Sequence, residues 1–211
     1  YMKLLETNRL EDSEDENISI PKGEKPAYFE WVLWRSFLAI DHLMIPASEA
    51  RGFKIDQDMR PLGHAGGGKP DCKFVFSDFV LVVEVTLTNS DRQYGTEGKP
   101  VQRHVLDIKK EYPDLPVHGL FLAPKLDPNT LGIYTQSEYW NEKQKWEVLV
   151  TPLKIRTFRE LFTAMCKANC ANPSHIYDVV QQIQEAKSDN PFDWEAAADD
   201  IVSRKTLSLI N

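Results

Sequence analysis

The chain has 211 residues, 42% of them hydrophobic, so it is long enough to form one sizeable domain with a conventional core. Its formal net charge of −7 argues against a protein that grips nucleic acid by itself, because duplex affinity comes largely from neutralisation of phosphates by Lys and Arg. A nuclease is compatible with this charge only if another component brings the DNA.

The cysteines and the hydropathy pattern bear on the compartment. Cys72, Cys166 and Cys170 are odd in number and lack metal-binding spacing, which indicates a reducing, cytoplasmic setting. We find no secretory leader and no apolar run long enough to span a bilayer, so we expect no association with membranes.

The first 24 residues are polar and acidic, with LEDSEDEN at residues 10–17. We interpret residues 1–24 as an acidic, flexible lead-in, which is either poorly ordered or a short helix with a flexible link. Pro26 is then well placed to open a helix over residues 27–43 that is apolar on nearly every side. Glu30 is the anomaly in this helix, because an unpaired buried carboxylate is costly. It either pairs with Arg35, faces solvent, or is one of several acids around a metal site.

Residues 66–88, GGGKPDCKFVFSDFVLVVEVTLT, are the part around which the chain is organised. Alternation along the second apolar run points Glu84 and Thr86 to the same side. A turn at Ser77 and Asp78 predicts a hairpin, which would bring Asp71 beside Glu84. Two carboxylates at one end of a sheet suit a Mg²⁺ ion that keeps several waters. The alternative is a purely structural hairpin with Glu84 exposed at an edge.

The next segment is polar and then amphipathic. We expect a loop over residues 89–98 and a helix over residues 99–112, with Pro100 in its first turn and an apolar stripe along one side. We expect positive and polar side chains close to the acids. They either form a solvent-exposed helix face or bind the scissile phosphate. They are Arg92, Gln93, Arg103, His104, Lys109 and Lys110.

The rest of the chain predicts an α/β fold. Residues 117–123 form a central strand that completes a βαβ crossover, and residues 147–153 form another strand. A capping box at residues 157–160 opens a helix over residues 158–167, and two more helices, over about 174–187 and 193–205, close the chain with packing faces only. We therefore expect an α/β core at 25–155, with a mixed central sheet flanked by helices, and a helical C-terminal part at 156–211 packed on it.

The order of these elements resembles the PD-(D/E)xK nuclease core: a helix with an acid, an Asp and a Glu on paired strands, then a crossover helix. Four local segments resemble the cleavage domains of AlwI-type restriction endonucleases, including the PleI and MlyI group and the small subunits of heterodimeric type IIS enzymes. The segments are YFEW at 28–31, PLGHAGGGKPD at 61–71, VVEVTLT at 82–88 and RQYGTEGKPVQRHV at 92–105. The resemblance covers residues 28–123 well.

This resemblance implies a site and a chemistry. Asp71 and Glu84 would bind Mg²⁺, for which Mn²⁺ would substitute, with the carbonyl of Val85 and the Glu30 carboxylate as further ligands. The ion would polarise a phosphodiester oxygen and activate a water, giving products with 5′-phosphate and 3′-hydroxyl ends.

The chain departs from the general motif at Thr86, where the motif has Lys. A hydroxyl can orient a water but supplies no positive charge. Four side chains are candidates for the missing charge or donor, namely Gln93, Arg103, His104 and Lys73.

The resemblance and the composition together predict a function. We expect an endonuclease that cleaves one strand of double-stranded DNA, as the catalytic subunit or cleavage domain of a type IIS restriction enzyme in a prokaryotic cytoplasm. We find no helix-turn-helix, zinc finger or basic stripe, so a larger partner subunit would supply recognition. The alternatives are a catalytically inactive interaction module with the nuclease fold, and a repair or mobile-DNA nuclease of the same fold.

Overall fold

The computed structural model describes residues 1–15, 17–88 and 91–210, and a four-stranded mixed sheet lies at its centre. The strand order is β1-β2-β3-β6; β1 and β2 are antiparallel, whereas β3 runs parallel to both β2 and β6. These strands are β1 (Cys72–Val75), β2 (Val80–Val85), β3 (Val117–Ala123) and β6 (Val150–Lys154). Their nearly continuous burial is typical of strands that helices cover on both faces.

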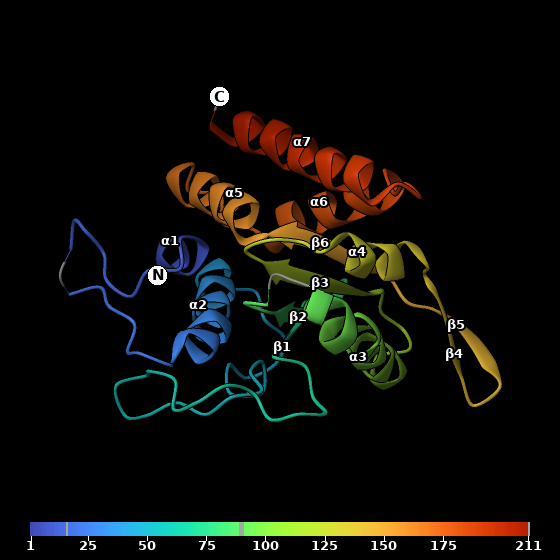
Figure 1. Cartoon of the computed structure of the whole chain (residues 1–211), viewed down its shortest axis with the longest axis horizontal. Coiled ribbons are helices and arrows are strands. Elements are labelled where there is room, and N and C mark those ends of the chain that lie inside the picture. The colour runs from blue at the N-terminus through green and yellow to red at the C-terminus, as the bar shows by residue number, and fades with distance from the viewer. Residues whose placement is uncertain (16, 89–90, 211) are drawn as a thin grey trace.

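Helices surround this sheet (Figure 1). α3 (Asp91–Glu111) makes the crossover from β2 to β3, and α2 (Lys25–Ile40) packs on β1 and β2. α5 (Ile155–Lys167), α6 (Pro173–Glu185) and α7 (Pro191–Ile210) gather beside β6. The remaining elements are α1 (Met2–Glu6), α4 (Pro128–Thr135), and the hairpin of β4 (Glu138–Asn141) and β5 (Gln144–Glu147), which projects from the body. None of the helices described is both long and apolar enough to cross a membrane.

The predicted α/β class is confirmed, and so are the hairpin, the crossover and the strand at 117–123. In the hairpin, the Phe76 N–H donates to the Phe79 carbonyl at 2.9 Å across the predicted turn. The helices predicted near 27–43, 174–187 and 193–205 are present as α2, α6 and α7, with shifted ends.

Three predicted boundaries are wrong. α3 begins at Asp91 rather than residue 99, so Pro100 lies inside the helix; residues 89–90 of the predicted loop lie outside the described residues. The strand predicted at 147–153 is divided between the end of β5 and the whole of β6. No capping box opens α5, because that helix begins at Ile155 and the Thr157 hydroxyl donates to Asp199 Oδ1 at 2.8 Å.

The first residues of the chain form the short helix α1. A short helix with a flexible link was one of the two interpretations of residues 1–24. Within α1, Leu4 and Leu5 are 2% and 1% exposed. An ion pair of 2.9 Å between Glu6 and Arg159 joins α1 to α5. The described acidic residues that follow α1 are largely exposed. The apolar residues of the MKLLE segment therefore explain why α1 packs on the core.

Gly119 allows β3 to lie close to its neighbours. A Cβ at this position would lie 2.7 Å from Val105 Cγ2 and 3.2 Å from Val150 Cγ2. Gly119→Ala is therefore expected to lower the free energy of unfolding by about 1–3 kcal/mol, through overpacking. Urea unfolding measures this, with Gly63→Ala as the control, since a Cβ at Gly63 would have no neighbour within 4 Å. Equal stability of the two variants would contradict the close packing of α3 on β3.

Candidate active site

The β1–β2 hairpin brings Asp71 and Glu84 together. Its register pairs Cys72 with Val83, so Asp71, one residue earlier, lies opposite Glu84. Asp71 Oδ2 accepts a hydrogen bond of 2.8 Å from the Val85 N–H, which ties the acid to the end of β2. Glu84 is only 6% exposed. The two carboxylates thus lie at one end of the hairpin, and Glu84 is not at an exposed edge.

Glu30 is a third acid in this region. It lies on α2, is 5% exposed, and its Oε2 accepts a hydrogen bond of 2.6 Å from the Ala65 N–H. Arg35 does not pair with it; its guanidinium lies 5.7 Å from the centre of the Trp31 ring. Neither the ion pair nor the solvent-facing position considered for Glu30 is therefore found.

Burial and mutual repulsion weaken the acidity of all three groups. Burial raises the pKa of Glu84 to about 8, and burial together with the charge of Asp71 raises the pKa of Glu30 to about 8. Burial and then the charge of Glu84 raise the pKa of Asp71 well above its ordinary value. Lys73, on the same hairpin, pairs instead with Glu111 at 2.7 Å. A group of acids whose pKa values are raised in this way favours a bound proton or cation.

The carboxylates fit a small, hydrated cation better than a fully protein-coordinated one. Among the described residues, no three His, Cys, Asp or Glu side chains are arranged to hold an ion. Mg²⁺ is usually bound through one or two carboxylates and several waters, a requirement that Asp71 and Glu84 can meet. The predicted participation of Glu30 and of the Val85 carbonyl as direct ligands stays a prediction.

His104 connects α3 to this site. Its Nδ1 lies 2.7 Å from Glu84 Oε1, and its ring is 9% exposed. Its Nε2 is buried without a hydrogen-bond partner among the described residues. Burial, and then the charge of Arg103, lower the pKa of His104, so the ring favours the neutral form near pH 7. His104 is the one candidate for the missing lysine that directly contacts an acid of the site.

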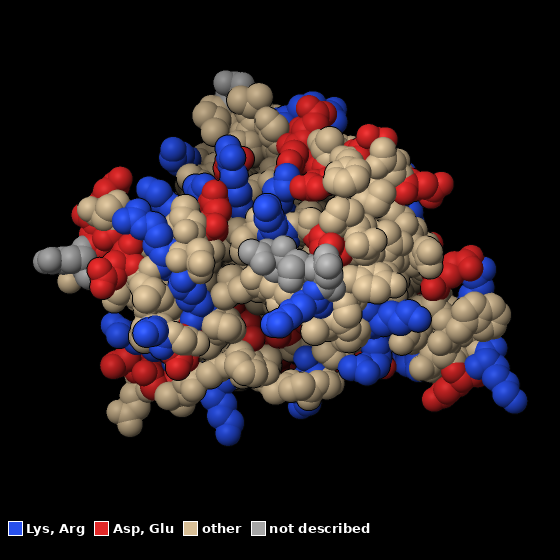
Figure 2. Space-filling view, in the orientation of Figure 1, with Lys and Arg blue, Asp and Glu red and all other residues tan. Residues whose placement is uncertain are grey.

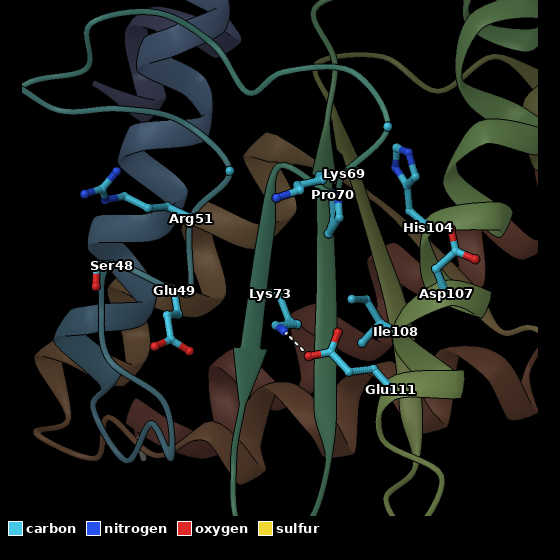
Figure 3. A pocket seen from close by; sticks show the side chains of 12 residues that line it. Ser48, Glu49, Arg51, Lys69, Pro70, Lys73, His104, Asp107, Ile108 and Glu111 are labelled. Carbon is cyan, nitrogen blue, oxygen red and sulfur yellow. Dashed lines mark hydrogen bonds and ion pairs between the residues drawn. The ribbon is translucent and has the colours of Figure 1, made fainter.

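A cavity of about 470 Å³ lies beside His104 (Figure 3). α3 bounds it on one side, and Arg51 and Lys69 extend from the facing loops. Lys69 is exposed and was absent from the predicted site, although it stands two residues before Asp71. It provides a positive charge on the same side of α3 as His104.

Glu97 is an acid that the sequence analysis missed. Its charge raises the pKa of both Glu84 and Asp71, so it lies near them on α3. It precedes His104 by seven residues, a spacing that places both on one face of a helix. This signal is in the sequence, but it was lost when residues 89–98 were interpreted as a loop.

Two other candidates have mainly structural contacts. Gln93 is fully buried, and its Nε2 donates to the carbonyls of Thr88 at 2.6 Å and Lys125 at 3.0 Å. Its Oε1 accepts from the Asp127 N–H at 2.8 Å. Thr86 is 7% exposed, and its hydroxyl accepts from the Thr88 N–H at 3.1 Å while remaining able to donate. Arg103, by contrast, is exposed on α3.

Gln93→Ala should therefore act on stability rather than on chemistry. Removing the amide leaves backbone groups of Thr88, Lys125 and Asp127 unpaired, which is expected to cost about 1–3 kcal/mol of unfolding free energy. Urea unfolding checks this against Gln144→Ala, a change at an exposed position of β5. Unchanged stability combined with lost DNA cleavage would instead place Gln93 among the catalytic residues.

The surface around the site has mixed charge. Figure 2 shows Lys and Arg side chains interspersed with Asp and Glu over this face, without one continuous basic area. This distribution matches the net charge of −7, and it gives the chain by itself little electrostatic affinity for a DNA duplex.

Comparison with known proteins gives the family. The family model for the AlwI restriction endonuclease matches residues 1–161. The structure is similar to the crystal structure of the small subunit, R.BspD6I2, of the heterodimeric restriction endonuclease R.BspD6I, with a TM-score of 0.67 and 24% sequence identity over 85% of this chain and 90% of that chain. No curated protein matches the chain. The chain therefore belongs to the AlwI restriction endonuclease family.

Proposed function

We propose that the chain is a Mg²⁺-dependent endonuclease that cuts one strand of duplex DNA, as the catalytic subunit or cleavage domain of a type IIS restriction enzyme in a prokaryotic cytoplasm. The observation that carries this proposal is the group formed by two buried acids, Glu30 and Glu84, and the partly buried Asp71, whose pKa values are all raised. Keeping such acids buried costs stability, which a site for a cation explains. Membership of a restriction endonuclease family supports the same function.

In this proposal Asp71 and Glu84 hold the ion, and the Val85 carbonyl completes its protein ligands. Bound Mg²⁺ supplies positive charge and Lewis acidity at the scissile phosphate. His104 holds the Glu84 carboxylate in place through its Nδ1 contact of 2.7 Å. Glu30 and the Thr86 hydroxyl orient the attacking water, and the products carry 5′-phosphate and 3′-hydroxyl ends.

The charge of the missing motif lysine must come from elsewhere. Lys73 is paired with Glu111, and Gln93 is neutral and bonded to backbone groups. Arg103 is exposed on α3, and Lys69 lines the same cavity as His104. We assign the role to Lys69, which lines the cavity, and to Arg103, which lies next to His104 on α3.

A larger partner supplies DNA recognition in this proposal. The acidic net charge and the mixed surface argue for such a partner, and the similar solved structure is the small subunit of a heterodimeric enzyme. The interaction-module alternative is favoured by two features, Thr86 in place of the motif lysine and the acidic net charge of the chain.

The test is nicking of supercoiled plasmid by the purified chain, with and without Mg²⁺ and with and without the recognition subunit of its own restriction system. We expect nicked circles only when both are present, and calorimetry with Mn²⁺ should show binding to the chain alone. Absence of nicking under every condition would favour the inactive module. Site-specific cleavage without a partner would contradict the subunit assignment.

A further inference from the structure

A wide groove lies between α3, α4 and the β4–β5 hairpin. Its volume is about 970 Å³, and Pro191 at the start of α7 closes one end. Figure 1 shows the hairpin projecting beyond the sheet, so one wall of the groove extends away from the body of the molecule. The mechanism proposed above uses none of the residues that line it.

Large aromatic side chains are exposed around this groove. Trp140 on β4 is 68% exposed and Tyr94 on α3 is 51% exposed, and both line the groove. Phe192, next to Pro191, is 63% exposed. Exposed aromatic residues clustered at one concave surface are typical of a protein interaction site, where Trp and Tyr often contribute most of the binding energy.

The projecting hairpin is held in place by α3. Lys110 Nζ donates to Asn141 Oδ1 at 2.8 Å and lies 5.7 Å from the centre of the Trp146 ring. Lys109 Nζ donates to the Glu147 carbonyl at 2.7 Å. These contacts preorganise Trp140 before binding, which lowers the entropy that a partner must overcome.

The charges of the groove fit a protein better than DNA. Of its described lining residues only Lys99 and Glu138 are charged, and Glu138 forms an ion pair with Lys145. One exposed lysine is too few to hold a phosphate backbone, whose binding depends on several cations. A protein surface with apolar side chains opposite the aromatic residues, hydrogen-bonding groups opposite Asn129 and Gln136, and a carboxylate opposite Lys99 matches this lining.

α3 separates the groove from the acids. His104, Asp107 and Glu111 face the cavity beside the acid site, whereas Tyr94, Lys99 and Gln102 line the groove. With 3.6 residues per turn these two sets lie on different faces of the helix. A partner in the groove would therefore leave the acid site open to DNA, and would contact the same helix that carries His104.

We propose that this groove is the docking surface for the larger recognition subunit, which inserts apolar side chains against Trp140 and Tyr94 and a carboxylate against Lys99. This inference rests on the proposed function, because that function requires such a partner. It adds the location of the interface and the chemistry of the surface that fits it.

The test measures the Kd between the full chain and the recognition subunit by surface plasmon resonance. Trp140→Ala, Tyr94→Ala and Lys99→Glu should each raise Kd roughly tenfold or more, with unchanged thermal stability. Met44→Ala and Leu207→Ala are matched controls, because these apolar residues are 66% and 59% exposed outside the groove and should leave Kd unchanged. Asp71→Asn should also bind normally, which separates docking from catalysis.

Three results would overturn the inference, and they can be told apart. If the unaltered chain does not bind the recognition subunit, both the docking surface and the subunit assignment fail. If it binds but the groove variants bind equally well, only the location of the interface is wrong. If the groove variants weaken binding of a DNA duplex and leave subunit binding unchanged, the groove is a nucleic-acid surface instead.

Discussion

Asp71→Asn and Glu84→Gln should each reduce Mg²⁺-dependent nicking by about 10³-fold or more, while making the metal-free protein more stable. The loss follows because the amides remove the negative charge that holds the ion, and with it the stabilisation of charge on the phosphate. The gain follows because each amide removes one of several buried, mutually repelling acids. An asparagine at position 71 retains an oxygen that can accept from the Val85 N–H, so the hairpin contact is preserved.

The measurements are the initial rate of plasmid nicking with the partner present and the thermal unfolding midpoint without metal. Asp107→Asn is the matched control, because Asp107 is exposed and lines the neighbouring cavity without contacting Glu84. It should nick at nearly the unaltered rate. Activity retained by both site variants would remove the metal-site assignment, and stability lost by both would show that the carboxylates are structural acceptors.

Stability of the metal-free protein should fall as the pH rises from about 6.5 to about 8 and then level off, while below about 6.5 the buried His118, whose pKa is lowered to about 4, opposes the fall. The pKa of both Glu30 and Glu84 is raised from a model-peptide value of 4.5 to about 8 in the folded protein. Between these values the folded state binds more protons than the unfolded state, so raising the pH favours unfolding. Each group contributes about 1.4 kcal/mol per pH unit in this interval, less where the acids share protons.

Thermal unfolding at a series of pH values, with and without Mg²⁺, checks this linkage. Mg²⁺ should have little effect near pH 4.5 and an increasing stabilising effect toward pH 8, because the ion competes with protons for the same carboxylates. Glu84→Gln should reduce the slope of the metal-free curve. A metal-free midpoint that rises between pH 6.5 and 8 would show that these acids are ionised in the fold and balanced by cations.

Agreement between the sequence and the structure is best where the interactions are local. Ser77 and Asp78 with their apolar flanks predicted the turn, and alternation predicted which residues of β2 share a side. The β1–β2 register then places Asp71 opposite Glu84. A turn and two short strands involve residues close in the chain, so the pattern of side chains alone determines this pairing.

Contacts between distant segments decided the parts that were predicted incorrectly. α3 continues upstream of Pro100 because Gln93 is bonded to Thr88, Lys125 and Asp127, more than thirty residues away in two cases, and because Gly98 lies against Ile133 on α4. Local propensity contains none of this information. The interpretation of residues 89–98 as a loop left Glu97 without an assigned role, whereas the assignment of Gln93 to the site stays a prediction.

The sequence by itself determined the acids, the hairpin that joins two of them, and the resemblance that led to the family. Only the tertiary structure decided which positive or polar side chains accompany those acids. Lys73 turns to Glu111, Gln93 is bonded to backbone groups, and His104 reaches Glu84 from a helix twenty residues further along the chain. The physical reason is that a buried ionisable group is stabilised by whichever partner the packing of separate elements brings within hydrogen-bond distance, and sequence spacing does not specify that partner.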